Sequence, residues 1–223
     1  DSTTAKILSR KIQISEDYIV REEFELLLLK EIFESKFGRS LVFKGGTALR
    51  LVYGSPRFSE DLDFSLVEEV DEDEFLSFLS GLGKGYPSIK EATASKKFYT
   101  LFGLVKIKEN FQERAFSIKI EVSRRKYPWI KDKDYSEKII RSEASPLTVL
   151  ANVVALEMVL SDKIEAMKTR KMARDVYDYW FVSQLLKNET KPDFFGYDRK
   201  RSIVELHKLL PRLYWELIDS WLS

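Results

Sequence analysis

The residues best suited to chemistry in this 223-residue chain are two aspartates, Asp61 and Asp63, which one residue separates. Polar and apolar residues alternate around them, and this alternation predicts a β-strand with both carboxylates on one face. Two like charges held so close repel each other unless a cation lies between them. Carboxylate oxygens are ligands that Mg²⁺ prefers, and such a pair can hold metal for chemistry on phosphate groups. We therefore expect Asp61 and Asp63 to bind magnesium; the alternative is a solvated strand edge.

A phosphate site is predicted just upstream, at Gly45, Gly46 and Thr47. Two glycines after a strand allow the backbone to approach a ligand closely. If a helix begins at Thr47, its free backbone amides favour phosphate, and the Thr47 hydroxyl would add a hydrogen bond. A lone Gly-Gly pair usually marks an ordinary turn. Its position before the Asp61 strand favours a site for the phosphates of an NTP.

A third carboxylate would complete such a site, and Glu121 is the best candidate. Its neighbours Ile120 and Val122 are predicted to face the core, so Glu121 faces the other way. It would act as a metal ligand or as the general base for the incoming hydroxyl. The alternative is a structural ion pair with Lys119, which lies on the same face.

A second cluster of charges lies in residues 162–178, within a helical pattern. Its cationic side chains suit the neutralisation of a triphosphate; they are Lys163, Arg170, Lys171 and Arg174. The alternative is a solvated helix face on which Glu165 and Asp178 pair with basic neighbours.

Composition excludes several other chemistries. The chain has no cysteine and one histidine, His207, so zinc–thiolate sites, cysteine nucleophiles and multi-histidine metal centres are not expected. Lys and Arg total 37 against 36 Asp and Glu, so any nucleic-acid site must come from local clustering of charge. No apolar run approaches the roughly 20 residues of a membrane span, and no signal-peptide core is seen. The sequence therefore predicts a cytoplasmic protein that does not enter the membrane.

The patterns predict an α+β arrangement that positions these residues. The predicted helices cover residues 15–37, 47–53 and 71–82, and the predicted strands cover residues 41–43, 61–65, 97–108 and 114–123. The last two strands are expected to form an antiparallel hairpin. Residues 127–145 are expected to be a polar connection, and residues from 156 onward are expected to be helical. This change of pattern predicts an α/β domain over residues 1–145 and a helical domain over residues 146–223.

Residues 43–49 (FKGGTAL) and 57–64 (RFSEDLDF) resemble the AbiEii toxin family. This family comprises the nucleotidyltransferase toxins of type IV toxin–antitoxin systems. Residues 163–178 resemble the helical motif of the same family. The resemblance implies a polymerase-beta-like nucleotidyltransferase fold, with a mixed sheet, flanking helices and a C-terminal helical domain. It also implies Mg²⁺ as cofactor, an NTP as substrate and the tRNA acceptor end as the acceptor.

The resemblance also implies roles for single residues. Gly46 and Thr47, next to Gly45, would hold phosphate, Asp61 and Asp63 would hold the metal, Lys163 would contact the NTP phosphates, and Asp175 would lie in the cleft with Arg174 nearby. The third acidic position varies in the family. Glu121 and Asp175 therefore both stay open as the general base.

Three functions compete at this stage. The first is a toxin-like nucleotidyltransferase acting on RNA, for which the basic segments at residues 124–126 and 168–174 would supply a local patch. The second keeps the chemistry but uses a protein or small-molecule acceptor. The third is a non-catalytic NTP-binding interaction protein. The toxin interpretation also implies a possible antitoxin partner.

Overall fold

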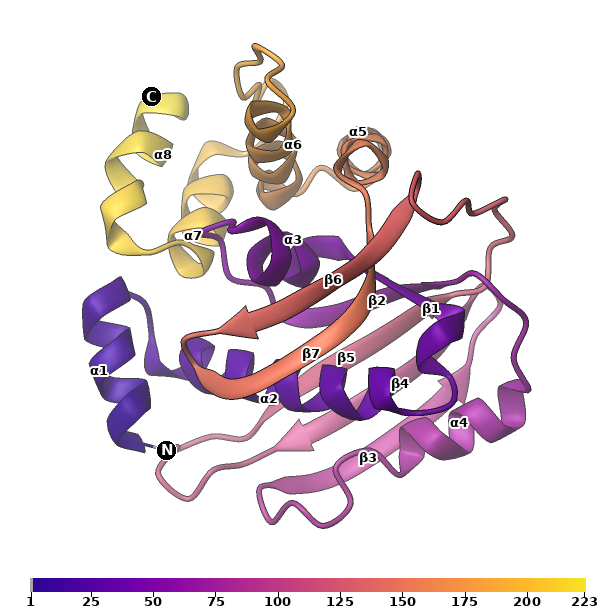
Figure 1. The fold of residues 1–223 in the computed structure, drawn as a ribbon. Helices are drawn as coiled ribbons and strands as arrows, with labels where there is room; N and C mark the ends of the chain where they lie inside the picture. The colour runs from indigo at the N-terminus through magenta and orange to yellow at the C-terminus, as the bar shows by residue number, and fades with distance from the viewer. Residues whose placement is uncertain (1) are drawn as a thin grey trace.

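One seven-stranded mixed sheet forms the centre of the protein in the computed structural model, which describes residues 2–223 (Figure 1). Its strands are β1 (Leu41–Lys44), β2 (Asp61–Leu66), β3 (Ile89–Lys96), β4 (Thr100–Ile107), β5 (Phe116–Ser123), β6 (Tyr135–Ser142) and β7 (Ser145–Val154). They lie in the order β3-β4-β5-β2-β1-β7-β6. Strands β1 and β2 are therefore central, and β3 and β6 form the two edges.

The register of the central strands brings charged residues together. Strand β1 runs antiparallel to β2 and pairs Lys44 with Asp63. Strand β2 runs parallel to β5 and pairs Asp63 with Glu121 and Asp61 with Lys119. Because side chains alternate along a strand, these five polar side chains share one face of the sheet.

Eight α-helices and two short 3-10 helices surround the sheet within the described residues. They are α1 (Ser2–Ile12), α2 (Glu16–Glu34), η1 (Gly38–Ser40), α3 (Gly45–Tyr53), α4 (Glu72–Ser80), α5 (Leu156–Arg170), α6 (Ala173–Leu185), α7 (Arg199–Leu209), η2 (Arg212–Tyr214) and α8 (Trp215–Trp221). Figure 1 shows α5 to α8 together at the top of the view, while α2 crosses the sheet. None of the helices between residues 2 and 223 is long and apolar enough to cross a membrane.

The main core lies between α2 and the face of the sheet opposite the charged residues. Phe43 of β1 and Phe64 of β2 are at most 1% exposed and belong to this core. Phe33 of α2 packs against Phe64 with ring centroids 6.0 Å apart. Burial of these large rings fixes β2, and so sets which way its alternate residues point.

A smaller apolar cluster attaches the C-terminal helices to the other face. Val42 of β1 and Val154 of β7 pack there with Leu49 of α3, Val159 of α5 and Val182 of α6. Helices α6, α7 and α8 share a further core of their own. The helices thus cover the β1–β7 side of this face and border a cleft over β2 and β5.

The structure confirms the α+β class, the mixed sheet and the helical C-terminal region. The helix after Ser15, the strand at Asp61 and the β4–β5 hairpin are also confirmed. Helix α3 begins at Gly45, two residues before the predicted start.

The predicted polar connection over residues 127–145 is wrong, because it contains strand β6, and strands β3 and β7 were not predicted. Strand β7 pairs with β1, so the sheet continues to Val154. We therefore propose that the boundary between the sheet region and the helical region lies at Ala155 rather than at residue 145.

Candidate active site

A cleft of about 530 Å³ lies between the charged face of the sheet and helices α5 and α6. Most of the predicted site residues line it, namely Gly45, Gly46, Asp61, Asp63, Glu121, Lys163 and Arg174. Thr47 and Asp175 are not among its lining residues. The fold therefore brings together residues from α3, β2, β5, α5 and α6 that lie far apart in the sequence.

Asp63 is a carboxylate of this cleft whose pKa is raised. Its pKa is raised to about 6, first by burial and then by the neighbouring charges of Asp61 and Glu121, while Lys163 and Lys44 oppose the shift. The Lys119 ammonium lies 3.6 Å from the Asp61 carboxylate. A cation beside Asp63 would relieve the repulsion that raises its pKa.

The metal-binding role of Asp61, Asp63 and Glu121 stays a prediction. Among residues 2–223, no group of three or more His, Cys, Asp or Glu side chains is arranged to hold a metal ion. Asp61 and Asp63 still offer oxygen donors next to each other on one face, with Glu121 paired opposite Asp63 on the neighbouring strand. This donor chemistry fits a hard divalent cation such as Mg²⁺. The role of Glu121 as a third ligand stays a prediction.

The two glycines allow close packing at the start of α3. Gly45 has a φ of +81°, a backbone conformation that other residues rarely adopt, and a Cβ there would overlap the Asp63 carboxylate. A Cβ at Gly46 would overlap the Arg57 guanidinium and lie 2.7 Å from Ser59 Oγ. The glycines thus leave the backbone open to the cleft and leave room for Asp63 and Arg57.

Thr47 has a different environment from the one predicted. It is 1% exposed, and its hydroxyl donates to the backbone carbonyl of Asp61 over 2.5 Å. This bond ties α3 to the start of β2 and so fixes the position of the carboxylate pair. A contact between Thr47 and phosphate stays a prediction.

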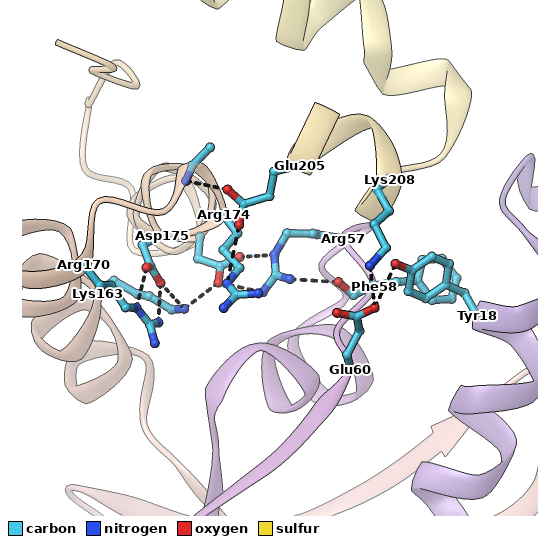
Figure 2. A network of polar contacts seen from close by, with 12 residues as sticks. Tyr18, Arg57, Phe58, Glu60, Lys163, Arg170, Arg174, Asp175, Glu205 and Lys208 are labelled. Atoms are coloured by element: carbon cyan, nitrogen blue, oxygen red, sulfur yellow. Dashed lines mark hydrogen bonds and ion pairs between the residues drawn. The ribbon is translucent and has the colours of Figure 1, made fainter. Parts of the chain in front are cut away.

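The helical wall of the cleft contains a buried network of ion pairs (Figure 2). Arg57 donates to both oxygens of Asp178, Nε to Oδ1 over 2.6 Å and Nη2 to Oδ2 over 2.7 Å. Lys163 Nζ lies 2.6 Å from Asp178 Oδ2. Burial acts to raise the pKa of Asp178, but the charges of Arg57 and Lys163 outweigh it and hold the pKa below its ordinary value.

Asp175 belongs to the same network. Its Oδ1 accepts from Lys163 over 3.0 Å, and Arg170 donates to both of its oxygens over 2.7 Å. Burial acts to raise the pKa of Asp175, yet Arg170 and Lys163 lower it overall. Both oxygens are therefore engaged, and the charge of Asp175 holds two cations at the cleft wall.

Other charged and aromatic residues complete the cleft. Lys44 pairs with Asp162 over 2.9 Å, and Arg174 Nε lies 3.6 Å from Glu205. At the rim, the Arg125 guanidinium lies 5.2 Å from the centre of the Tyr99 ring. No role was predicted for Arg57, whose partner Asp178 lies 121 residues away. Its place in the motif directly before the Asp61 strand was the only available signal.

Comparison with solved structures shows the same fold in other proteins. JHP933 from Helicobacter pylori is 21% identical, with a TM-score of 0.62 over 94% of this chain and 90% of that one. A putative nucleotidyltransferase from H. pylori gives the same identity and TM-score over 94% and 92% of the two chains. MenT4, a nucleotidyltransferase toxin from Mycobacterium tuberculosis H37Rv, is 19% identical, with a TM-score of 0.62 over 98% and 88% of the chains.

Comparison of the sequence gives the family. A search of curated protein sequences found no match. The sequence profile of the AbiEii family, described as the nucleotidyl transferase AbiEii toxin of a type IV toxin–antitoxin system, matches residues 27–208. The matched region includes the carboxylates of β2, both glycines and the ion pairs of the helical wall. The protein therefore belongs to the AbiEii family of nucleotidyltransferase toxins.

Proposed function

We propose that this enzyme transfers a nucleotide from an NTP to a hydroxyl at the acceptor end of tRNA, with Mg²⁺ held by Asp61 and Asp63. The observation that carries the proposal is the pairing of these carboxylates with a cationic wall across one cleft. The carboxylates suit a metal, and the wall suits the phosphates that the metal would bind.

In the proposed reaction the acceptor oxygen attacks the α-phosphorus of the NTP. The bond from that phosphorus to the oxygen bridging to the β-phosphate breaks, and pyrophosphate leaves with the electron pair. Bound Mg²⁺ would supply positive charge for the phosphate oxygens. The chain's own part is to hold the triphosphate at the start of α3 and against Lys163, Arg170 and Arg174, so that the α-phosphorus lies near β2.

The acceptor hydroxyl must also lose its proton, and the structure favours Glu121 over Asp175 as the base. Both oxygens of Asp175 are bound to Lys163 and Arg170, and its pKa is lowered. Glu121 is exposed, lines the cleft and lies opposite Asp63. We therefore assign Asp175 a positioning role, in which it holds Lys163 and Arg170 at the cleft.

An RNA acceptor is supported by the family and by the rim of the cleft. Phe98 and Tyr99 are 81% and 54% exposed and pack edge to face with centroids 4.4 Å apart. Exposed aromatic rings beside an arginine suit the stacking of nucleobases. Tyr99 and Arg125 both line the cleft that contains the carboxylate pair.

The proposal is tested by incubating the protein with each labelled NTP, magnesium and total tRNA. Label should appear in tRNA, depend on added magnesium and be absent in the Asp61→Asn and Asp63→Asn variants. Absence of label from RNA would rule out the tRNA acceptor, and activity in both variants would rule out the proposed metal site.

The alternatives have their own signatures in the same assay. Label in protein or in a small molecule would favour another acceptor, and NTP binding with no transfer to any acceptor would favour a non-catalytic protein. The family also suggests a cognate antitoxin. An antitoxin encoded beside this protein should suppress the transfer when the two are mixed.

A further inference from the structure

A second and larger cavity, of about 930 Å³, lies beside the catalytic cleft. Its walls come from α1, the start of α2, the start of β5, α7 and the segment around η2. The backbone amide of Arg212 donates to the carbonyl of Gln13 over 3.1 Å, which joins the η2 segment to the end of α1. Nothing in the proposed reaction uses this cavity.

Positive charge dominates its lining. Five cationic side chains line it, against two carboxylates, Asp17 and Glu60; the cations are Arg10, Arg21, Arg114, Lys208 and Arg212. We call it the arginine cavity.

Three of these arginines have no acidic partner in the part of the chain that the structure describes. Arg10, Arg114 and Arg212 are exposed, and no ion pair of theirs is found within residues 2–223. The Arg212 guanidinium instead lies 5.6 Å from the centre of the Trp215 ring. Arg21 differs, because it donates to the backbone carbonyls of Glu60 and Ser117. Three unpaired guanidinium groups from separate segments thus border one cavity, an arrangement that suits an extended polyanion.

Glu60 connects the arginine cavity to the catalytic cleft, because it lines both and directly precedes Asp61. Figure 2 shows its carboxylate between Lys208 and Tyr18. Lys208 Nζ lies 2.9 Å from Glu60 Oε1, and the Tyr18 hydroxyl donates to the same oxygen over 3.3 Å. Lys208 therefore compensates the carboxylate that borders both cavities, which lowers its repulsion of a phosphate chain bound nearby.

We propose that the arginine cavity binds backbone phosphates of the acceptor RNA, at nucleotides beyond the one whose hydroxyl reacts near Asp61. This inference rests on the proposed function, since it assumes an RNA acceptor. The cavity exceeds the catalytic cleft in volume, and its cations lie on several segments, which favours a chain over a mononucleotide. Its position beside the catalytic cleft, with Glu60 in the wall of both, favours the acceptor itself over an acidic protein partner.

The test is RNA binding by a charge-reversal variant, Arg10→Glu with Arg114→Glu and Arg212→Glu. Affinity for tRNA is measured by fluorescence anisotropy without NTP, over a range of salt concentrations. The Kd should rise by at least about tenfold, and the salt dependence should become shallower, because fewer counterions are released. NTP binding should be unchanged, since these arginines lie outside the catalytic cleft.

A matched control is Lys84→Glu with Lys133→Glu and Lys138→Glu, which makes the same change of net charge at exposed positions outside both cavities. An equal loss of binding in the control, or no loss in the arginine variant, would overturn the proposal, as would failure of the unmodified protein to bind tRNA. If the triple variant does not fold, Arg114→Gln, in an exposed turn, should still weaken binding by about twofold or more. If tRNA binds through these arginines but receives no label, the proposed transfer fails while the binding site stands.

Discussion

Aspartates occur in two opposite electrostatic states on the two sides of the catalytic cleft. On the sheet side, Asp61 and Asp63 lie beside each other, and the pKa of Asp63 is raised by burial and by like charges. On the helical side, Asp175 and Asp178 are fully buried, yet their pKa values are lowered by the cations that surround them. The sheet keeps a surplus of negative charge, and the helical wall has its charges compensated.

This difference suggests that the sheet carboxylates bind a ligand and that the wall carboxylates support the fold. A pair of like charges that is only partly compensated costs stability unless a ligand brings more positive charge. A compensated buried network stabilises the fold as long as it is complete. Removal of one member leaves its partners charged and buried without a counter-charge, which costs stability. We therefore expect substitutions of the sheet carboxylates to affect activity, and substitutions of the wall carboxylates to affect folding.

The largest expected effect is on catalysis, from Asp63→Asn. The variant should lose nucleotidyl transfer by about 10³-fold or more, because a neutral amide is a poor ligand for the metal. Its melting temperature should be equal or higher, since the repulsion among Asp61, Asp63 and Glu121 is relieved. Transfer assays and thermal unfolding of the same preparation measure both. A clear drop in melting temperature would contradict the comparison, and Glu137→Gln on the exposed edge strand β6 serves as control.

The next effect is on stability, from Asp178→Asn. Arg57 and Lys163 would lose the carboxylate that compensates them, so the free energy of unfolding should fall by about 3–5 kcal/mol. Asp162→Asn is the matched control, because it breaks the more exposed Asp162–Lys44 pair and should cost less than about 1 kcal/mol. Urea unfolding compares the two. Similar losses of unfolding free energy in both variants would show that burial of the network does not determine its contribution to stability.

A smaller effect on catalysis is expected from Glu121→Gln, the proposed base. Because Glu121 is exposed and its charge repels Asp63, the melting temperature of the variant should be equal or slightly higher, while kcat should fall by about 10²-fold with little change in KM for the NTP. Asp175→Asn should show the converse, a lower melting temperature. Full kcat in the Glu121→Gln variant would mean that another group acts as the base.

Four of the seven strands could be predicted, and the two edge strands and β7 could not. The alternation around Asp61 and Asp63 predicted β2 because Leu62 and Phe64 are fully buried on the opposite face. Strands β3 and β6 are the two edges of the sheet, and their sequences are interrupted by charges such as Lys90, Glu91 and Lys138. Edge strands need less apolar surface and often carry charge, so the pattern that reveals a central strand is absent there.

The cleft was predictable where function depends on neighbouring residues in sequence, and not where it depends on long-range pairing. Gly45 and Gly46 lie close to Asp63 in sequence, and the motif brought them together. The pairing of Arg57 with Asp178 joins positions 121 residues apart, and only the packing of α6 against the sheet region decides it. The side chain of Thr47 illustrates the same limit, because its hydroxyl contacts a backbone carbonyl that no spacing indicates.

The smallest expected effect is a change in the acid limit of stability. The pKa values of Asp175 and Asp178 are lower in the folded protein than in the unfolded chain, where an aspartate has a pKa of about 3.9. Between these values the unfolded chain binds more protons, so stability rises with pH there, is fully present above about pH 5, and is lost as the pH falls through the folded values. Urea unfolding between pH 3 and pH 7 should show this loss in the unmodified protein. Asp178→Asn should be less stable at pH 7 and should lose less stability on acidification, because one of the two depressed carboxyls is gone. An equal acid dependence in both proteins would mean that the compensated network does not set the acid limit.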